Sequence, residues 1–263
     1  MVALAELFPA GDFRFHLTLR RGAPAEFFGL QDASGERLRE RRRWLAEDPA
    51  RYAALTAAGA VVLAEFAANA VEWRLPRPDA AEDIVAWGAS AEPDLLFLRA
   101  DAAGRFRLEG GALCFPTGWA LQEKMGRTLD EIHGVVPGLN AALASPIQQF
   151  LQRLKPGVAW RRANWGLAAT AELNLHPARA VPAPALPVRL DALWLRVEEQ
   201  ALVALPRSGG IVFGIRIALH RLDHVTAEPT VRAGLRRALE TMPDDLAIYK
   251  RIEPIRAALT CAL

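Results

Sequence analysis

The chain of 263 residues is 52% hydrophobic and 24% charged, a balance typical of a globular protein with one large domain or two small ones. Its formal net charge of +2 is too small to indicate a nucleic-acid partner. Its 2 cysteines, Cys114 and Cys261, are too few for the four thiolates of a typical iron–sulfur cluster, and their wide separation favours reduced thiols over a disulfide scaffold.

The N-terminal region predicts a strand followed by helices. Apolar and polar side chains alternate from Phe13 to Arg20, which is the period-two pattern of a half-buried strand. Residues 36–46 predict a charged helix. Asp48 before Pro49 is typical of an N-cap and a first helical residue, and predicts an Ala-rich helix over residues 49–73.

The longest apolar stretch, residues 53–71, lies within that Ala-rich helix. It is interrupted by Thr56, Glu65 and Asn69, so we expect a buried or half-buried helix and no membrane span. The N-terminus shows no basic leader before its short apolar run, which argues against a secretory signal. These features predict a cytoplasmic protein.

The middle of the chain predicts antiparallel strands. Asp79 predicts the cap of a helix that ends at about Trp87, and residues 94–100 predict a strand. Residues 105–108 and 112–115 predict two more strands. The pair Gly110-Gly111 between them is typical of a tight hairpin turn.

The segment from Pro116 to Pro137 is unusually rich in turn residues. Such residues fix the path of the backbone and the direction of the side chains, which a plain core helix would not require. Residues 139–154 then predict a helix that ends before Pro156-Gly157, and residues 158–165 predict a strand.

The last third predicts a stiff linker, a long hairpin and two helices. Residues 176–187 contain four prolines and predict the linker. Residues 190–205 and 211–219 flank a Pro-Arg-Ser-Gly-Gly turn and predict the hairpin. Glu228-Pro229 opens a helix to Thr241, and Pro243 opens a last one. The sum is a mixed α+β domain without internal repeats.

Three blocks of sequence resemble one family. The first runs from Pro116 to Gly138 and contains Trp119, Lys124 and His133. The second is Arg161-x-x-Asn164-Trp165, and the third is Arg196-x-Glu198-x-Gln200 with the residues that follow it to Ser208. In this order and spacing they are similar to the haem-dependent oxidative N-demethylase α-subunit family, over roughly residues 10–250.

The resemblance implies a fold, a cofactor and partners. The fold would be a PAS-like antiparallel sheet with flanking helices in one domain of residues 1–263, with an arm and helices over 1–90, a PAS-like core over about 91–225 and C-terminal helices over 226–263. Haem b would catalyse oxidation of a small secondary or tertiary amine. FMN and a 2Fe-2S cluster would lie only on partner chains of a reductase, which fits the shortage of thiols.

His133 is the residue that we expect at the iron. An imidazole can ligate a metal or transfer a proton near neutral pH. The alternative is a histidine that only caps a short helix over residues 128–132. His176, next to the linker, is the second choice for the iron. His16 is expected in solvent, and His220 and His224 have the i,i+4 spacing of a zinc pair but no third ligand.

Cationic and aromatic residues of the three blocks complete the candidate site. Lys124, Arg161 and Arg196 are expected to meet haem propionates or substrate, or else to form ion pairs with Glu198 or Asp130. Trp119 and Trp165 are expected to line the pocket, with Trp165 near the substrate; the alternative is ordinary core packing.

Two functions follow from these expectations. The first is oxidative N-demethylation, with electrons from a separate reductase. The second is a non-catalytic PAS-like protein that binds haem or another small ligand as a sensor. The basic run from Arg37 to Arg43 predicts a solvated helix face, or else a docking face for a donor subunit.

Overall fold

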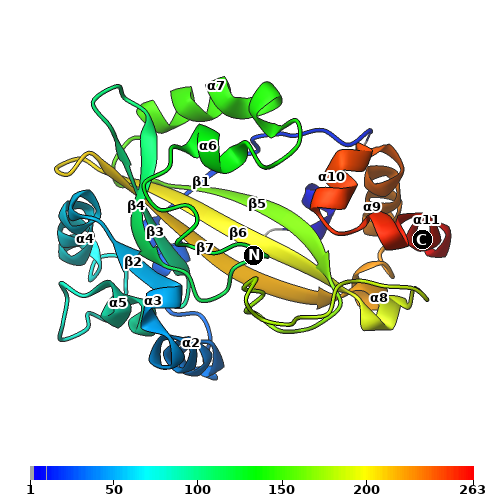
Figure 1. The fold of residues 1–263 in the computed structure, drawn as a ribbon, viewed down its shortest axis with the longest axis horizontal. Helices are drawn as coiled ribbons and strands as arrows, with labels where there is room; N and C mark the ends of the chain where they lie inside the picture. Colours follow the sequence, from blue (N-terminus) through cyan, green and yellow to red (C-terminus); the bar gives the residue numbers. More distant parts are fainter. Residues whose placement is uncertain (1–2, 10) are drawn as a thin grey trace.

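The computed structural model describes residues 3–9 and 11–263; residues 1, 2 and 10, which belong to the predicted N-terminal arm, lie outside the described part. Within that part the chain forms a seven-stranded antiparallel sheet in the order β1-β5-β6-β7-β3-β4-β2 (Figure 1). The strands are β1 (Arg20–Gly22), β2 (Ala53–Leu55), β3 (Asp94–Ala100), β4 (Phe106–Ala112), β5 (Ala159–Ala168), β6 (Trp194–Leu205) and β7 (Gly210–Arg221).

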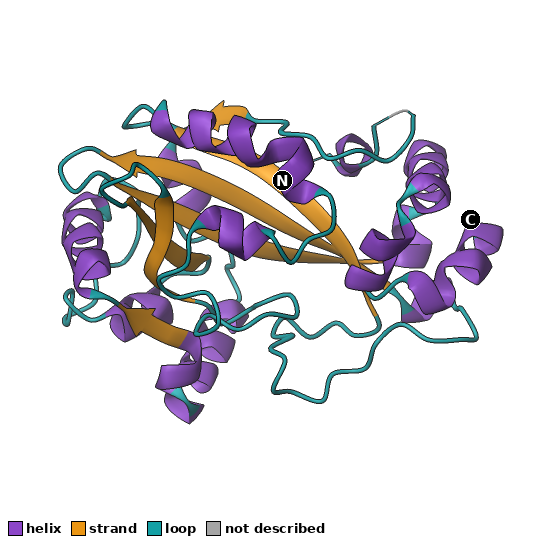
Figure 2. Cartoon of the chain, turned by 45° about the horizontal axis from the view of Figure 1, so that its top comes forward, coloured by secondary structure: helices purple, strands orange, loops and turns teal. Residues whose placement is uncertain are grey.

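Helices surround this sheet in separate groups (Figures 1 and 2). Those near β2, β3 and β4 are α2 (Glu36–Glu47), α3 (Pro49–Tyr52), α4 (Ala57–Asn69) and α5 (Ile84–Ser90), and α1 (Pro24–Phe28) precedes them. The pair over β5 and β6 is α6 (Leu129–His133) and α7 (Leu139–Gln152). Those at the far end are α8 (Leu222–Val225), α9 (Pro229–Thr241), α10 (Asp244–Tyr249) and α11 (Arg256–Ala262). The sheet with its flanking helices confirms the predicted α+β class.

The register of the long strands decides which side chains share a face of the sheet. Arg162 on β5 lies opposite Gln200 on β6, and Gln200 lies opposite Ile215 on β7. Directly opposed residues point to the same side, and their chain neighbours point to the other. Arg162, Gln200 and Ile215 therefore belong to one face, which α6 and α7 cover.

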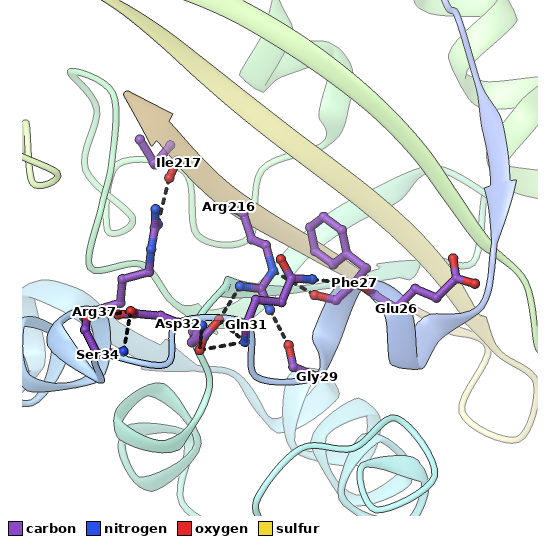
Figure 3. A network of polar contacts seen from close by, with 10 residues as sticks. Glu26, Phe27, Gly29, Gln31, Asp32, Ser34, Arg37, Arg216 and Ile217 are labelled. Carbon is purple, nitrogen blue, oxygen red and sulfur yellow. Dashed lines mark hydrogen bonds and ion pairs between the residues drawn. The ribbon is translucent and has the colours of Figure 1, made fainter. Parts of the chain in front are cut away.

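The opposite face is packed against α1 and the residues that follow it (Figure 3). Arg216 of β7 donates hydrogen bonds to the carbonyl oxygens of Phe27 at 2.7 Å and Gly29 at 2.6 Å, and it forms a buried ion pair with Glu92 at 2.5 Å. Glu92 also accepts a hydrogen bond from the backbone N–H of Gln31. The charges of Arg216 and Glu92 are thus paired within the protein.

A buried ion pair joins α2 to the sheet. The guanidinium of Arg41 donates to Asp94 at 2.7 Å, and both side chains are fully buried. Asp94 also accepts hydrogen bonds from the backbone N–H groups of Cys114 and Phe115. This cluster fixes the chain as it leaves β4 toward the turn-rich segment.

The prediction of two strands around Gly110-Gly111 was wrong. Residues 106–112 form one continuous strand, β4, which pairs with β3 on one side and β2 on the other. A Cβ atom on Gly111 would lie 2.2 Å from the carbonyl oxygen of Leu95, and one on Gly110 would lie 2.5 Å from Cδ1 of Leu55. The two glycines therefore allow neighbouring strands to approach closely and do not form a turn.

The prediction of one helix over residues 49–73 was also wrong. Asp48 does cap a helix by accepting from the N–H of Arg51, but this helix, α3, ends at Tyr52. Residues 53–55 then form β2, and Thr56 caps α4 by accepting from the N–H of Gly59. Pairing of β2 with the edge of β4 outweighs the helical propensity of alanine.

Other boundaries differ in detail. The helix predicted to begin at Asp79 is α5, which Asp83 caps instead. The helix predicted from Pro243 is α10, followed by a separate α11. The predicted elements at 36–46, 94–100, 139–154 and 229–241 are confirmed with small shifts, and Glu228 caps α9.

The strand predicted from Phe13 to Arg20 is formed only at its end. β1 begins at Arg20 and pairs with Arg161, Trp160 and Ala159 of β5. Residues 13–19 run without strand pairing, and the N–H of Phe13 donates instead to the hydroxyl of Thr241 on α9. The chain therefore separates from β5 beyond the Arg20–Arg161 pair.

Within the described residues no helix is both long enough and apolar enough to cross a bilayer. The predicted cytoplasmic location remains a prediction.

The Asp94–Arg41 pair yields a prediction about stability. Asp94→Ala leaves a buried, uncompensated guanidinium, so we expect a loss of roughly 3–5 kcal/mol in the free energy of unfolding. Urea denaturation followed by circular dichroism measures this loss.

A matched control is Glu36→Ala. Glu36 pairs with Arg39 at 3.6 Å, and both side chains are mostly exposed. Its removal is expected to cost less than about 1 kcal/mol. Equal losses in the two variants would contradict the structural role of Asp94.

Candidate functional site

A cavity of about 510 Å³ lies on the sheet face that α6 and α7 cover. Leu202 and Phe213 belong to its floor, together with Leu96, Leu98 and Leu108 of β3 and β4. Its roof includes Leu129 and Ile132 of α6 and Ile147, Phe150 and Leu151 of α7. Such a concave, mainly apolar space with a few polar groups is typical of a small-molecule site.

The remaining walls come from both ends of the chain. Residues 13–21 line one side, where the chain separates from β5, and residues 246, 249 and 250 at the end of α10 line another. The cavity thus occupies the space left where residues 13–19 do not pair with β5.

A capping box fixes α6. The hydroxyl of Thr128 accepts from the N–H of Glu131, and the carboxylate of Glu131 accepts from the N–H of Thr128 at 2.6 Å. The N–H of Gly126 donates to the carbonyl oxygen of Leu108, which ties this turn to β4. These bonds place His133, the last residue of α6, at the cavity wall.

His133 is half-buried, and its ring lines the cavity. Burial, and next the positive charge of Arg162, lower its pKa from 6.5 to about 4. Neither ring nitrogen forms a hydrogen bond with a described residue, so the predicted alternative of a purely capping histidine has no capping bond to support it. At neutral pH the imidazole is uncharged and has a free lone pair.

Two more predicted residues lie beside His133 in the cavity wall. Lys124 Nζ lies 5.6 Å from the centroid of the Trp119 ring, a distance at which the cation is attracted to the ring face. Burial lowers the pKa of Lys124. Both side chains come from the turn-rich segment and line the cavity.

Arg161 and Trp165 of β5 also line the cavity. Arg161 forms a long ion pair, 3.6 Å, with the exposed Glu26, and its guanidinium lies 6.0 Å from the centroid of the Phe27 ring. Trp165 is 8% exposed, and its ring packs 5.0 Å from that of Phe8. The ammonium of Lys250 donates to the carbonyl oxygen of Trp165 at 2.7 Å and lies 5.1 Å from its ring centroid.

Arg196 does not line the cavity. Its guanidinium is buried and donates to Thr117 Oγ1 at 2.9 Å and to the carbonyl oxygens of Phe115 at 2.9 Å and Leu173 at 2.7 Å. Burial lowers its pKa to about 10. The predicted pair with Glu198 does not form; Arg196 joins two loops instead.

His176 also lies outside the cavity. It is 6% exposed, its Nδ1 accepts from the N–H of Ala178, and its ring packs 5.5 Å from that of Tyr52. Burial lowers its pKa. Its place near α3 separates it from the residues around His133.

His16 differs from its predicted solvent exposure, because it is half-buried and lines the cavity. His220 and His224 do not line it. No group of three or more His, Cys, Asp or Glu residues in the described chain is arranged to hold a metal ion.

The sequence prediction missed Arg162, Gln200 and Lys250, and it treated Glu198 only as a partner for arginine. All four line the cavity. The period of two in β5 and β6 could have placed Arg162, Glu198 and Gln200 on one face, had the register been known. Lys250 carried no such signal, because its position depends on how α10 packs against β5.

These observations define an α+β protein with a largely apolar cavity, an uncharged imidazole in its wall and several cations around it. Residues 27–260 match the family described as haem-dependent oxidative N-demethylase, alpha subunit-like, and the chain belongs to this family. The match covers most of the chain and confirms the resemblance in the three sequence blocks. The description points to an oxidoreductase that depends on haem and works with other subunits.

The pKa of His133 can be tested directly. In ¹H–¹³C NMR spectra of the protein without added haem, the ring signals of His133, assigned with His133→Gln, should titrate with a midpoint near 4.

A midpoint near 6.5 would contradict the burial of this ring. Since the unfolded histidine binds a proton more tightly than the folded one, His133 makes stability rise with pH between about 4 and 6.5. Urea denaturation should therefore show a weaker rise over this window in His133→Gln than in the unaltered protein.

Proposed function

We propose that the protein binds haem b in this cavity and catalyses oxidative N-demethylation of a small methylated amine. The observation that carries the proposal is the uncharged imidazole of His133 in the wall of a large apolar cavity. Family membership supports the haem and the type of reaction.

The residues present fit a haem group. Its macrocycle requires apolar walls, its iron a neutral nitrogen ligand, and its two carboxylates cations or hydrogen-bond donors. Leucine, isoleucine and phenylalanine side chains line the floor and roof. His133 would hold the iron, Lys124 would hold a propionate, and Trp119 would pack beside the ring. The guanidinium of Arg161 lies near Phe27 and Glu26 of α1, so Arg161 is not part of this proposal. Arg196 and His176 are not part of this proposal, because their side chains lie outside the cavity.

When bound, haem supplies the activation of oxygen; in the overall reaction an N-methylamine, O₂, two electrons and two protons give the demethylated amine, formaldehyde and water. The chain's residues hold the amine and move its proton. Trp165 would form an apolar wall for the methyl groups. Glu198 has one carboxylate oxygen bonded to Gln200 Nε2 at 3.0 Å, and would accept the proton that a protonated amine must lose before oxidation.

Partner subunits would supply the electrons. We propose that FMN and a 2Fe-2S cluster lie on these partners. We also propose that residues 1–263 act as one domain, with the PAS-like core over about 91–225 and the other segments packed on it.

Haem binding gives the first test. Purified protein, as isolated or after addition of haemin, should show a Soret band, and His133→Ala should shift it or lose at least about tenfold in haem affinity, because the iron loses its nitrogen ligand. His224→Ala is the matched control, since its side chain is 71% exposed and lies outside the cavity. An unchanged band in His133→Ala would overturn the assignment of the ligand.

Product formation gives the second test. Haem-loaded protein with a chemical or enzymatic reductant, O₂ and an N-methylamine should release formaldehyde, measured by a colorimetric assay. Haem uptake without formaldehyde from any amine in a series would favour the sensor function instead. A protein that takes up no haem would exclude N-demethylation and the haem-binding version of the sensor function.

A further inference from the structure

Arg162 is half-buried and differs from the two buried arginines of the sheet. Arg196 and Arg216 each donate to several carbonyl oxygens, and Arg216 also pairs with Glu92. The guanidinium of Arg162 lines the cavity and forms no hydrogen bond or ion pair with any described residue. Burial lowers its pKa, while the negative charge of Glu198 acts in the opposite direction. The guanidinium therefore senses Glu198 but makes no direct contact with it.

Glu198 is the matching anion. Among the described residues, the carboxylates that line the cavity are those of Glu6 and Glu198. Glu6 pairs with Arg20. Glu198 accepts a single hydrogen bond, from Gln200, and forms no ion pair with the described residues. Most of its capacity to accept hydrogen bonds is free for a ligand.

The register places these two free charges close together. Arg162 lies opposite Gln200 and Asn164 lies opposite Glu198, so Arg162 and Glu198 are diagonal neighbours on one face of the sheet. Diagonal neighbours lie about 7–8 Å apart, within reach of long side chains. The two side chains could meet, yet no ion pair forms between them. The space between the charges suits a ligand that carries both signs.

The local charge favours the same kind of ligand. Arg162 and Lys250 are cations and Glu198 is an anion. Burial lowers the pKa of each cation, and the negative charge of Glu198 raises it in part. Other lining residues add further charges, and cations outnumber anions; they are Glu6, Arg14, Arg20, Arg21, Lys124 and Arg161. A simple alkylammonium ion would add another positive charge to this cationic, partly desolvated site, whereas a zwitterion adds no net charge.

We propose that the substrate class is an N-methylated amino acid, whose ammonium is bound by Glu198 and whose carboxylate is bound by Arg162. The proposal rests on the proposed function, which gives the methylated amine, and it states in addition that this amine carries a carboxylate. Bidentate contact between a guanidinium and a carboxylate then orients the methyl group within the cavity.

Two probes of nearly equal shape test the proposal. N,N-dimethylglycine carries the carboxylate, and N,N-dimethylglycine amide lacks its charge. We expect isothermal titration calorimetry on haem-loaded protein, without reductant, to show at least about tenfold tighter binding of the acid, since charged hydrogen-bonded pairs contribute this much or more. Equal affinity, tighter binding of the amide, or no binding of either probe would overturn the proposal.

Two variants test which residue binds the carboxylate and which binds the ammonium of the ligand. Arg162→Met keeps the apolar part of the side chain and should abolish the preference for the acid, while affinity for the amide stays within about twofold. Glu198→Gln should weaken both probes about tenfold or more. Arg236→Met is the control and should change neither, because Arg236 is exposed on α9. A preference that persists in Arg162→Met would overturn the assignment of the carboxylate.

The outcome separates this proposal from the proposed function. If dimethylamine yields formaldehyde but the acid shows no preference, N-demethylation stands and the amino-acid class is wrong. If the protein takes up no haem, the same titration is made on the haem-free protein. A preference for the acid found there keeps the amino-acid class, and the haem-dependent reaction is wrong. If Arg162→Met lowers haem affinity and leaves the acid preference intact, Arg162 serves a haem propionate and the proposal is overturned.

Discussion

The pleat of β5, β6 and β7 is the constraint on which the rest of the structure depends. It sends alternate side chains to two faces with different surroundings. On one face Arg216 and its neighbours are paired with α1 and the residues after it. On the other, Arg162, Glu198 and Gln200 open into a cavity beneath α6 and α7. A slip of one residue between these strands would exchange the two sets, so the register itself determines the chemistry of the cavity.

Buried arginines therefore have different roles that depend on what surrounds them. Arg41 and Arg196 each bind oxygen atoms from distant parts of the chain and hold those parts together. Arg162 lies on a strand of the sheet, as Arg196 does, but the separation of residues 13–19 from β5 leaves open space beside it. Under the proposal made above, a charge without a bonded partner in the fold distinguishes a binding group from a structural one.

Much of the fold was predictable because local signals agreed with tertiary pairing. The hairpin of β6 and β7, the helix caps at Asp48 and Glu228, and the helix α7 follow directly from turn residues and periodicity. The errors lie where a distant strand decided the outcome. Gly110 and Gly111 resemble a turn but allow close strand contact, and alanines 53 and 54 join the sheet although their neighbours are helical.

The amino-acid sequence alone determined the α+β class and the family, because these depend on patterns within short stretches. Only the tertiary structure decided which residues meet in the cavity. It placed Arg196 and His176 outside, and brought Arg162, Glu198 and Lys250 together from β5, β6 and the end of α10. These residues meet through strand register and helix packing, and both are set by contacts between segments far apart in the chain.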